Sequence, residues 1–119
     1  MIRSVLFPLM VAVGLLAAAD ARAHAVLVES SPPAEAEVVG SKVEFRLRYN
    51  SRIDAKRSRL SLKGAGGAKT LAPLQGASEA ELIARVEGLG PGRYTLFWDV
   101  LSVDGHVSRG QVPFITITP

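Results

Sequence analysis

Apolar and polar residues alternate along the segment KVEFRLRYN, residues 42–50. Its apolar positions are Val43, Phe45, Leu47 and Tyr49, and a charged side chain stands between each of them and the next. Successive side chains of a β-strand point to opposite faces of the sheet. The alternation therefore predicts a strand with one buried face and one face in solvent.

Short strands are also predicted over residues 24–33, 58–64, 80–88, about 93–100 and 109–118. The segment 80–88 fits a helix or a strand, and its alternation among predicted strands favours a strand. GAGGAK, residues 64–69, is typical of a flexible turn. In 109–118 the apolar positions change parity, which suggests a bulge or a strand end covered on both faces. Strands spaced by about 8–12 residues predict an all-β sandwich or barrel.

The first 23 residues have the pattern of a secretory signal peptide. Arg3 precedes an apolar run from Val5 to Ala19, and Ala21 and Ala23 supply the small residues of a cleavage site. The alternative is a transmembrane anchor, but the run is shorter than the roughly 20 apolar residues that a spanning helix needs. We therefore expect cleavage after residue 23, a periplasmic protein, and one domain over residues 24–119.

The amino-acid composition excludes cysteine chemistry and raises the question of a basic binding surface. The chain contains no cysteine, so disulfides, thiolate metal sites and lipid attachment at cysteine are not expected. The formal net charge is +3, and basic residues cluster between Arg46 and Arg59. Such a cluster could bind nucleic acid or anionic lipid. Without interleaved aromatic residues, a solvated strand face and turn is the better interpretation.

His24, one of only two histidines in the chain, follows the predicted cleavage site directly. After cleavage it would offer a metal two ligands, the free α-amine and the ring Nδ1, which together close a chelate. Such nitrogen ligands suit Cu(II), which also has the highest affinity among the first-row divalent ions. The alternative is that His24 is only the first residue of a frayed terminus.

The other histidine, His106, stands in the sequence Asp104-Gly105-His106. On an extended segment side chains at i and i+2 point to the same side, and Gly105 would otherwise allow a tight turn between them. The pair could provide two further metal ligands, or a carboxylate that orients the imidazole ring. The alternative is a surface-loop histidine and a turn-capping aspartate. Trp98, in a predicted strand, is expected to pack in the core and could also line the site.

The mature chain resembles the CopC family of periplasmic copper-binding and copper-resistance proteins. The resemblance rests on HAVLVESSPPAEAEV at its start, on KVEFRLRYNSRID, and above all on YTLFWDVLSVDGHVSRGQVPF. It implies a small Greek-key β-sandwich or barrel, similar to immunoglobulin-like and cupredoxin-type domains. It also implies one Cu(II) per chain, bound by the His24 amine and Nδ1, His106 and Asp104, with Trp98 nearby.

The sequence departs from the family in two places. Some relatives carry a methionine-rich loop that binds Cu(I), whereas the two methionines here, Met1 and Met10, both lie in the predicted signal peptide. Some relatives also have a glutamate after the second strand, where this chain has Tyr49 or Asn50. The resemblance therefore implies a Cu(II) site without a thioether site, and leaves the fourth protein contact open.

The leading functional hypothesis is a copper carrier or buffer in copper resistance or homeostasis that exchanges copper with a CopD-like membrane transporter. Such a protein is not an enzyme, and we expect a monomer that binds no nucleic acid. Two alternatives stay open: a copper redox enzyme with a histidine brace, and a metal-free sandwich domain that binds protein partners. The small domain and a hard carboxylate ligand count against the enzyme.

Overall fold

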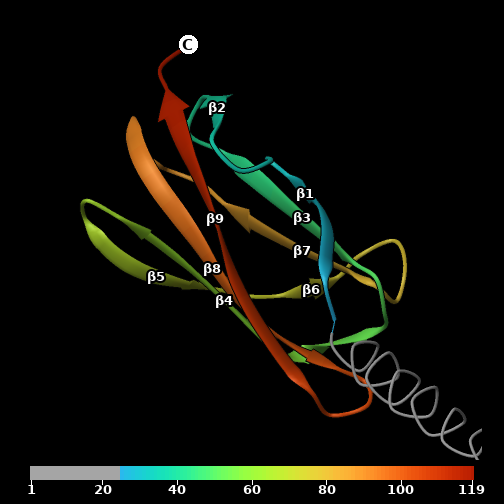
Figure 1. Cartoon of the computed structure of the whole chain (residues 1–119). Coiled ribbons are helices and arrows are strands. Elements are labelled where there is room, and N and C mark those ends of the chain that lie inside the picture. Colours follow the sequence, from blue (N-terminus) through green and yellow to red (C-terminus); the bar gives the residue numbers. More distant parts are fainter. Residues whose placement is uncertain (1–24) are drawn as a thin grey trace, which may run out of the picture.

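The computed structural model describes residues 25–119, which form two β-sheets packed face to face (Figure 1). No helix occurs in this part of the chain, so the prediction of an all-β sandwich is confirmed. The predicted signal peptide, residues 1–23, and His24 lie outside the described residues. The strands are β1 Leu27–Ser31, β2 Ala36–Val39, β3 Val43–Tyr49, β4 Ile53–Gly64, β5 Gly67–Leu71, β6 Leu74–Gln75, β7 Glu81–Val86, β8 Gly92–Ser102 and β9 Val107–Ile117.

The two sheets draw their strands from the whole length of the domain. One sheet has the order β1-β3-β7-β6 and the other β2-β9-β8-β4-β5. All neighbours are antiparallel except β2 and β9, which run parallel. The segment 80–88, which fitted a helix or a strand, contains strand β7 at the centre of the first sheet.

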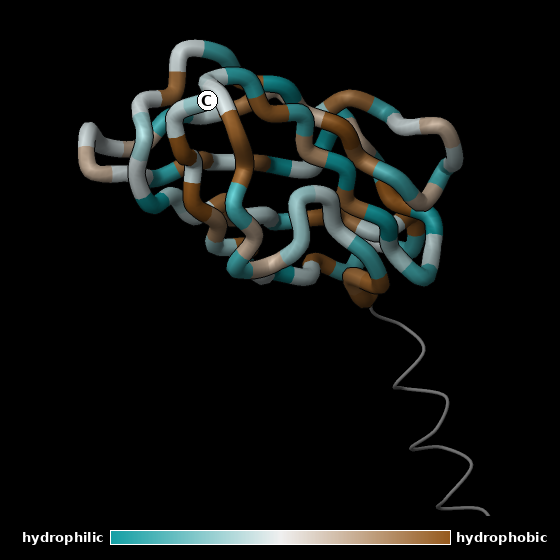
Figure 2. The backbone as a smooth tube through the Cα atoms, turned by 90° about the horizontal axis from the view of Figure 1, so that it is seen from above, coloured by the Kyte–Doolittle hydropathy of each residue, from teal (hydrophilic) through white to brown (hydrophobic). Residues whose placement is uncertain are grey.

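The core consists of the inward-facing positions of both sheets. Along β3 buried and exposed residues alternate without interruption, as the sequence predicts, and Figure 2 shows hydrophobic and hydrophilic stretches alternating along the chain. Phe45 of β3 meets Phe114 of β9 edge to face, with ring centroids 5.4 Å apart. Contacts of this kind between aromatic rings join the two layers and stabilise them beyond simple burial of area.

Of the two explanations that the sequence suggested for the change of apolar parity in 109–118, a bulge is wrong, and cover on both faces holds only in part, at Ile115. The β8–β9 ladder runs without a register shift from Gly92–Thr116 to Leu101–Val107. Val112 and Phe114 face the core, while Ile115 is half-buried and Ile117 is 38% exposed on the outer side. Register shifts occur instead in the β1–β3 and β4–β8 pairs, the latter between Asp54 and Arg59.

The start of the described chain and the turn between β8 and β9 lie at one end of the sandwich. The C-terminus lies at the opposite end (Figure 1). Nothing in residues 25–119 is a helix of the length and hydrophobicity required to span a bilayer.

Candidate metal centre

The turn between β8 and β9 carries Asp104 and His106. β8 ends at Ser102 and β9 begins at Val107, and the backbone N–H of Ser102 donates to the carbonyl of His106 at 2.8 Å. Gly105 donates to the carbonyl of Ser102 at 2.9 Å with a φ of 95°. Glycine adopts this left-handed region without steric cost, so Gly105 permits the tight turn that brings its two neighbours together.

Asp104 and His106 are in contact, as the i, i+2 spacing predicts. The Oδ1 atom of Asp104 lies 3.1 Å from Nδ1 of His106 and accepts a hydrogen bond from the His106 backbone N–H at 3.3 Å. Both side chains are about half exposed, at 49% and 50%. A carboxylate facing Nδ1 favours the tautomer that carries the proton there, which leaves Nε2 as the metal-binding nitrogen.

Ser102 is a member of this site that sequence reasoning missed. Its side-chain hydroxyl donates to Oδ1 of Asp104 and also lies 3.1 Å from the carbonyl oxygen of His106. The hydrogen bonds from Ser102, and then those from His106, lower the pKa of Asp104 to about 2. Asp104 therefore keeps its negative charge beside the imidazole throughout the neutral range. The sequence feature that could have predicted this contact is the spacing of two residues between Ser102 and Asp104.

The start of the described chain is held in place by Asn50. Ala25 is only 3% exposed and belongs to the core. The backbone N–H of Val26 donates to Oδ1 of Asn50 at 2.8 Å, and the Asn50 N–H donates to the Val26 carbonyl at 3.0 Å. Asn50 thus anchors the residues that immediately follow His24 in the sequence.

The segment after Asn50 leads directly to the β8–β9 turn. The carbonyl of Arg52 accepts a hydrogen bond from the N–H of Val103 at 3.2 Å, and Ile53 pairs with Ser102 in the β4–β8 ladder. A short chain of backbone contacts therefore connects Val26 to the turn that holds Asp104 and His106. This fixes the beginning of the folded domain at the end of the sandwich where the carboxylate and the imidazole lie.

Tyr49 lies inside the core. It is 2% exposed, and its ring meets that of Trp98 edge to face with centroids 5.3 Å apart. Burial raises the pKa of the Tyr49 hydroxyl far above its usual range, so the group stays neutral and is a poor metal ligand. Trp98 is 6% exposed, which confirms its expected core role. Of the two residues left open for a fourth contact, the structure gives Tyr49 a packing role and Asn50 an anchoring role.

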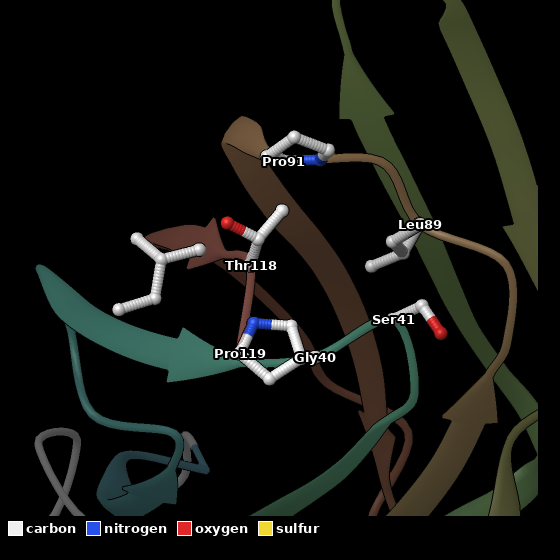
Figure 3. Close-up of a pocket in the computed structure, with 7 residues that line it drawn as sticks. Gly40, Ser41, Leu89, Pro91, Thr118 and Pro119 are labelled. Atoms are coloured by element: carbon white, nitrogen blue, oxygen red, sulfur yellow. The ribbon is translucent and has the colours of Figure 1, made fainter.

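Beyond the contact between Asp104 and His106, the described residues form no larger cluster of side chains that bind metals. Within residues 25–119 no group of three or more histidine, cysteine, aspartate or glutamate side chains comes together to hold a metal ion. A hollow of about 220 Å³ at the opposite end of the sandwich is lined by glycine, serine, leucine, proline, isoleucine and threonine (Figure 3). Because that lining contains no titratable side chain, the β8–β9 turn is the better candidate for metal chemistry.

Comparison with known proteins identifies the family of this chain. The CopC domain matches residues 27–116. The chain is 28% identical to Protein YobA of Escherichia coli K12 over 116 residues, which cover 94% of each protein. Among solved structures it is similar to CopC from Methylosinus trichosporium OB3b, with a TM-score of 0.72 and 28% identity over 80% of this chain and 95% of that one.

A further solved structure shares the fold. PcoC, a methionine-rich copper resistance protein from Escherichia coli, matches with a TM-score of 0.64 and 24% identity, over 80% of this chain and all of that one, 100%. The same sandwich therefore occurs in a protein whose methionine content differs from that of this chain, in which the two methionines are Met1 and Met10.

Proposed function

This chain belongs to the CopC domain family, and we propose that it binds one Cu(II) ion in the periplasm and acts as a copper carrier or buffer in copper resistance or homeostasis. The family assignment makes it a binding protein and not an enzyme. Copper is the ion that the protein carries. The site must therefore bind the ion tightly enough to retain it and must still release it to a partner.

The observation that carries the proposal is the pairing of Asp104 with His106 on a turn at the end of the domain where the described residues begin. The two side chains are 3.1 Å apart and half exposed, so an ion in solution can reach them. Asn50 and Ala25 hold the start of the folded chain at the same end. A ligand residue placed immediately before Ala25 would therefore be tethered close to the turn.

We assign His24 as that residue, in the form that cleavage after Ala23 would create. Its α-amine and Nδ1 would provide two nitrogen ligands, and His106 would provide a third through Nε2. Asp104, which the family resemblance implies as an oxygen ligand, completes the proposed site. Its Oδ1 contacts Nδ1 of His106, and this contact supports the second role that its sequence spacing suggested, a carboxylate that orients the ring.

The ligand chemistry favours Cu(II) over Cu(I). Imidazole, amine and carboxylate groups are borderline to hard ligands, whereas Cu(I) prefers thiolates and thioethers. The chain has no cysteine, and Met1 and Met10 both precede the proposed cleavage site. We therefore expect tight binding of Cu(II) and weak binding of Cu(I) by the mature protein.

The remaining parts of the proposal concern location and partner. The pattern of residues 1–23 supports export through a signal peptide. A monomer with a surface site can exchange copper with a second protein directly, and we infer that this partner is a CopD-like membrane transporter.

A Cu(II) titration of protein purified from the periplasm tests the function. Trp98 is the only tryptophan, so quenching of its fluorescence reports binding, and an EPR spectrum at one equivalent shows how many nitrogens bind the ion. We expect one Cu(II) per chain with about three nitrogen ligands, and loss of Cu(I) to a competing chelator. A protein that binds no Cu(II), or that retains Cu(I) against the chelator, would contradict the proposal.

A further inference from the structure

The basic cluster between Arg46 and Arg59 separates in the structure onto the outer faces of two different sheets. Arg46 and Arg48 lie on β3, whereas Arg57 and Arg59 lie on β4. On one outer face the arginines are matched by carboxylates, and on the other they are in excess. The face with excess arginine is the candidate binding surface.

On the outer face of the β1-β3-β7-β6 sheet each arginine has a glutamate partner. Arg46 contacts Glu44 at 2.9 Å and Glu81 at 3.5 Å. Arg85 contacts Glu44 at 2.8 Å, and Arg48 contacts Glu29 at 3.6 Å. Three arginines are thus matched with three glutamates, and this face is neutral.

The outer face of the other sheet has more arginines than carboxylates. The registers place Arg59 of β4 opposite Asp99 of β8, and Asp99 opposite Arg109 of β9. Arg109 contacts Asp99 at 3.4 Å, and Arg57 contacts Asp54 at 3.7 Å. Among residues 25–119 no carboxylate pairs with Arg59. The row across the three strands therefore carries excess positive charge.

These side chains line a groove and not a flat surface. Arg57, Arg59, Arg109 and Asp99 surround a hollow of about 270 Å³, whose apolar residues include Leu101 and Val107. A second hollow, of about 230 Å³, shares Arg59 and Asp99 with the first and includes Phe97. The two hollows are neighbours, because they share the lining residues Arg59 and Asp99, and we call the two together the arginine groove.

We propose that the arginine groove binds an extended acidic segment of a partner protein. The guanidinium groups match carboxylates by forked hydrogen bonds. Phe97, 38% exposed, offers an apolar surface to a side chain between the acidic ones, and arginine and aromatic residues are enriched in protein interfaces.

Asp99 on the groove surface favours a peptide over a membrane. Its carboxylate can accept a hydrogen bond from a peptide N–H, whereas it would repel a lipid phosphate. A concave groove also suits a narrow chain better than a flat bilayer surface does. Because Leu101 and Val107 adjoin the β8–β9 turn, a segment bound in the groove would end beside Asp104 and His106.

Fluorescence anisotropy on the metal-free protein tests the groove, with a short labelled peptide of alternating glutamate and leucine at low ionic strength. We expect Arg59→Gln to weaken peptide binding by about tenfold, and Arg59→Lys to weaken it less, because lysine keeps the charge and loses the fork. Arg93→Gln is the matched control. Arg93 lies on β8, the strand next to that of Arg59 in the same sheet. It pairs with Glu35 at 3.8 Å and is 68% exposed, but does not line the groove.

The possible outcomes distinguish peptide binding from membrane binding, and they distinguish failure of the groove proposal from failure of the copper proposal. Binding that falls in Arg59→Gln and stays within about twofold in Arg93→Gln supports the groove. No peptide binding, equal loss in both variants, or Arg59-dependent binding of phosphatidylglycerol vesicles in place of the peptide overturns it. Cu(II) affinity should be unchanged in Arg59→Gln, so failure of the groove leaves the copper site standing.

Discussion

Asn50 and Val26 exchange two hydrogen bonds, from the Val26 N–H to Oδ1 of Asn50 at 2.8 Å and from the Asn50 N–H to the Val26 carbonyl at 3.0 Å. The first of these bonds depends on a side chain that is 24 positions away in the sequence. It anchors the beginning of the domain next to the segment that contacts the β8–β9 turn. We therefore predict that Asn50 acts as a positioning residue for the proposed ligand His24, which precedes Ala25 in the sequence.

Replacing Asn50 by alanine should weaken Cu(II) binding although the residue is no proposed ligand. Loss of the side-chain acceptor frees the N–H of Val26, and we expect about 1 kcal/mol of lost stability and about tenfold weaker Cu(II) binding. Calorimetric titration and urea unfolding measure the two effects. Asn50→Asp, which keeps an acceptor oxygen, is the control and should bind more tightly than Asn50→Ala. Equal affinity of Asn50→Ala and the parent would show that anchoring is irrelevant.

The processed protein should begin at His24. The amine ligand exists only if the residue is terminal, because a preceding residue converts the amine into an amide. Intact-mass measurement of the periplasmic protein checks the start. A variant with one additional alanine before His24 should fold normally and bind Cu(II) much more weakly. If the intact mass shows that the periplasmic protein begins at any other residue, the metal site as proposed is wrong.

His106 and Asp104 should differ in what their loss does to copper binding. His106→Ala removes the only imidazole in residues 25–119 and should lower Cu(II) affinity by orders of magnitude. Asp104→Asn should cost about 10–100-fold, the size typical of groups that support a metal ligand. Titration calorimetry of both variants decides, with circular dichroism as a check of folding. Parent-like affinity of His106→Ala means that His106 is not a ligand.

Strands in which apolar and polar residues alternate could be predicted from the sequence, whereas a strand without this alternation, such as β5, could not. β3 alternates over its full length because one face is buried. The first three residues of β5 were expected to belong to a flexible turn, because they lie in the glycine-rich stretch 64–69. Four of the five residues of β5 are exposed, so the strand has no apolar alternation that could reveal it. In the structure the turn shrinks to residues 65–66, and Gly67 begins β5 with a φ of 115°.

The local part of the site was predictable and the long-range part was not. Asp104 and His106 are two residues apart, so strand and turn geometry alone brings them together. Asn50 reaches Val26 across the fold, and the arginines of one sequence cluster separate between two sheets. Such relationships depend on strand order, which brings together segments that lie far apart in the sequence.

Gly110 should be required for the packing of Trp98. The two residues are directly paired in the β8–β9 ladder, and a Cβ atom on Gly110 would lie 2.6 Å from Cε2 of the indole. Gly110→Ala must displace the ring, so we expect a loss of about 1–3 kcal/mol, measured by urea unfolding. Gly66→Ala is the control, because a Cβ atom there meets no atom within 4 Å. Equal stability of the two variants would mean that the ring adjusts freely.

Ser102 should set the acidity of Asp104 in the metal-free protein. Its hydrogen bond is the main cause of the lowered Asp104 pKa, which lies at about 2. Because the folded-state pKa is below the unfolded value of about 3.9, the carboxylate stabilises the fold fully above that value, and its contribution is lost as pH falls towards 2. Ser102→Ala should raise the Asp104 pKa towards its ordinary value, whereas Ser102→Thr, which keeps the hydroxyl, should not. Carbon-13 chemical shifts of the carboxyl group against pH measure this, and an unchanged pKa in Ser102→Ala would assign the effect to His106 alone.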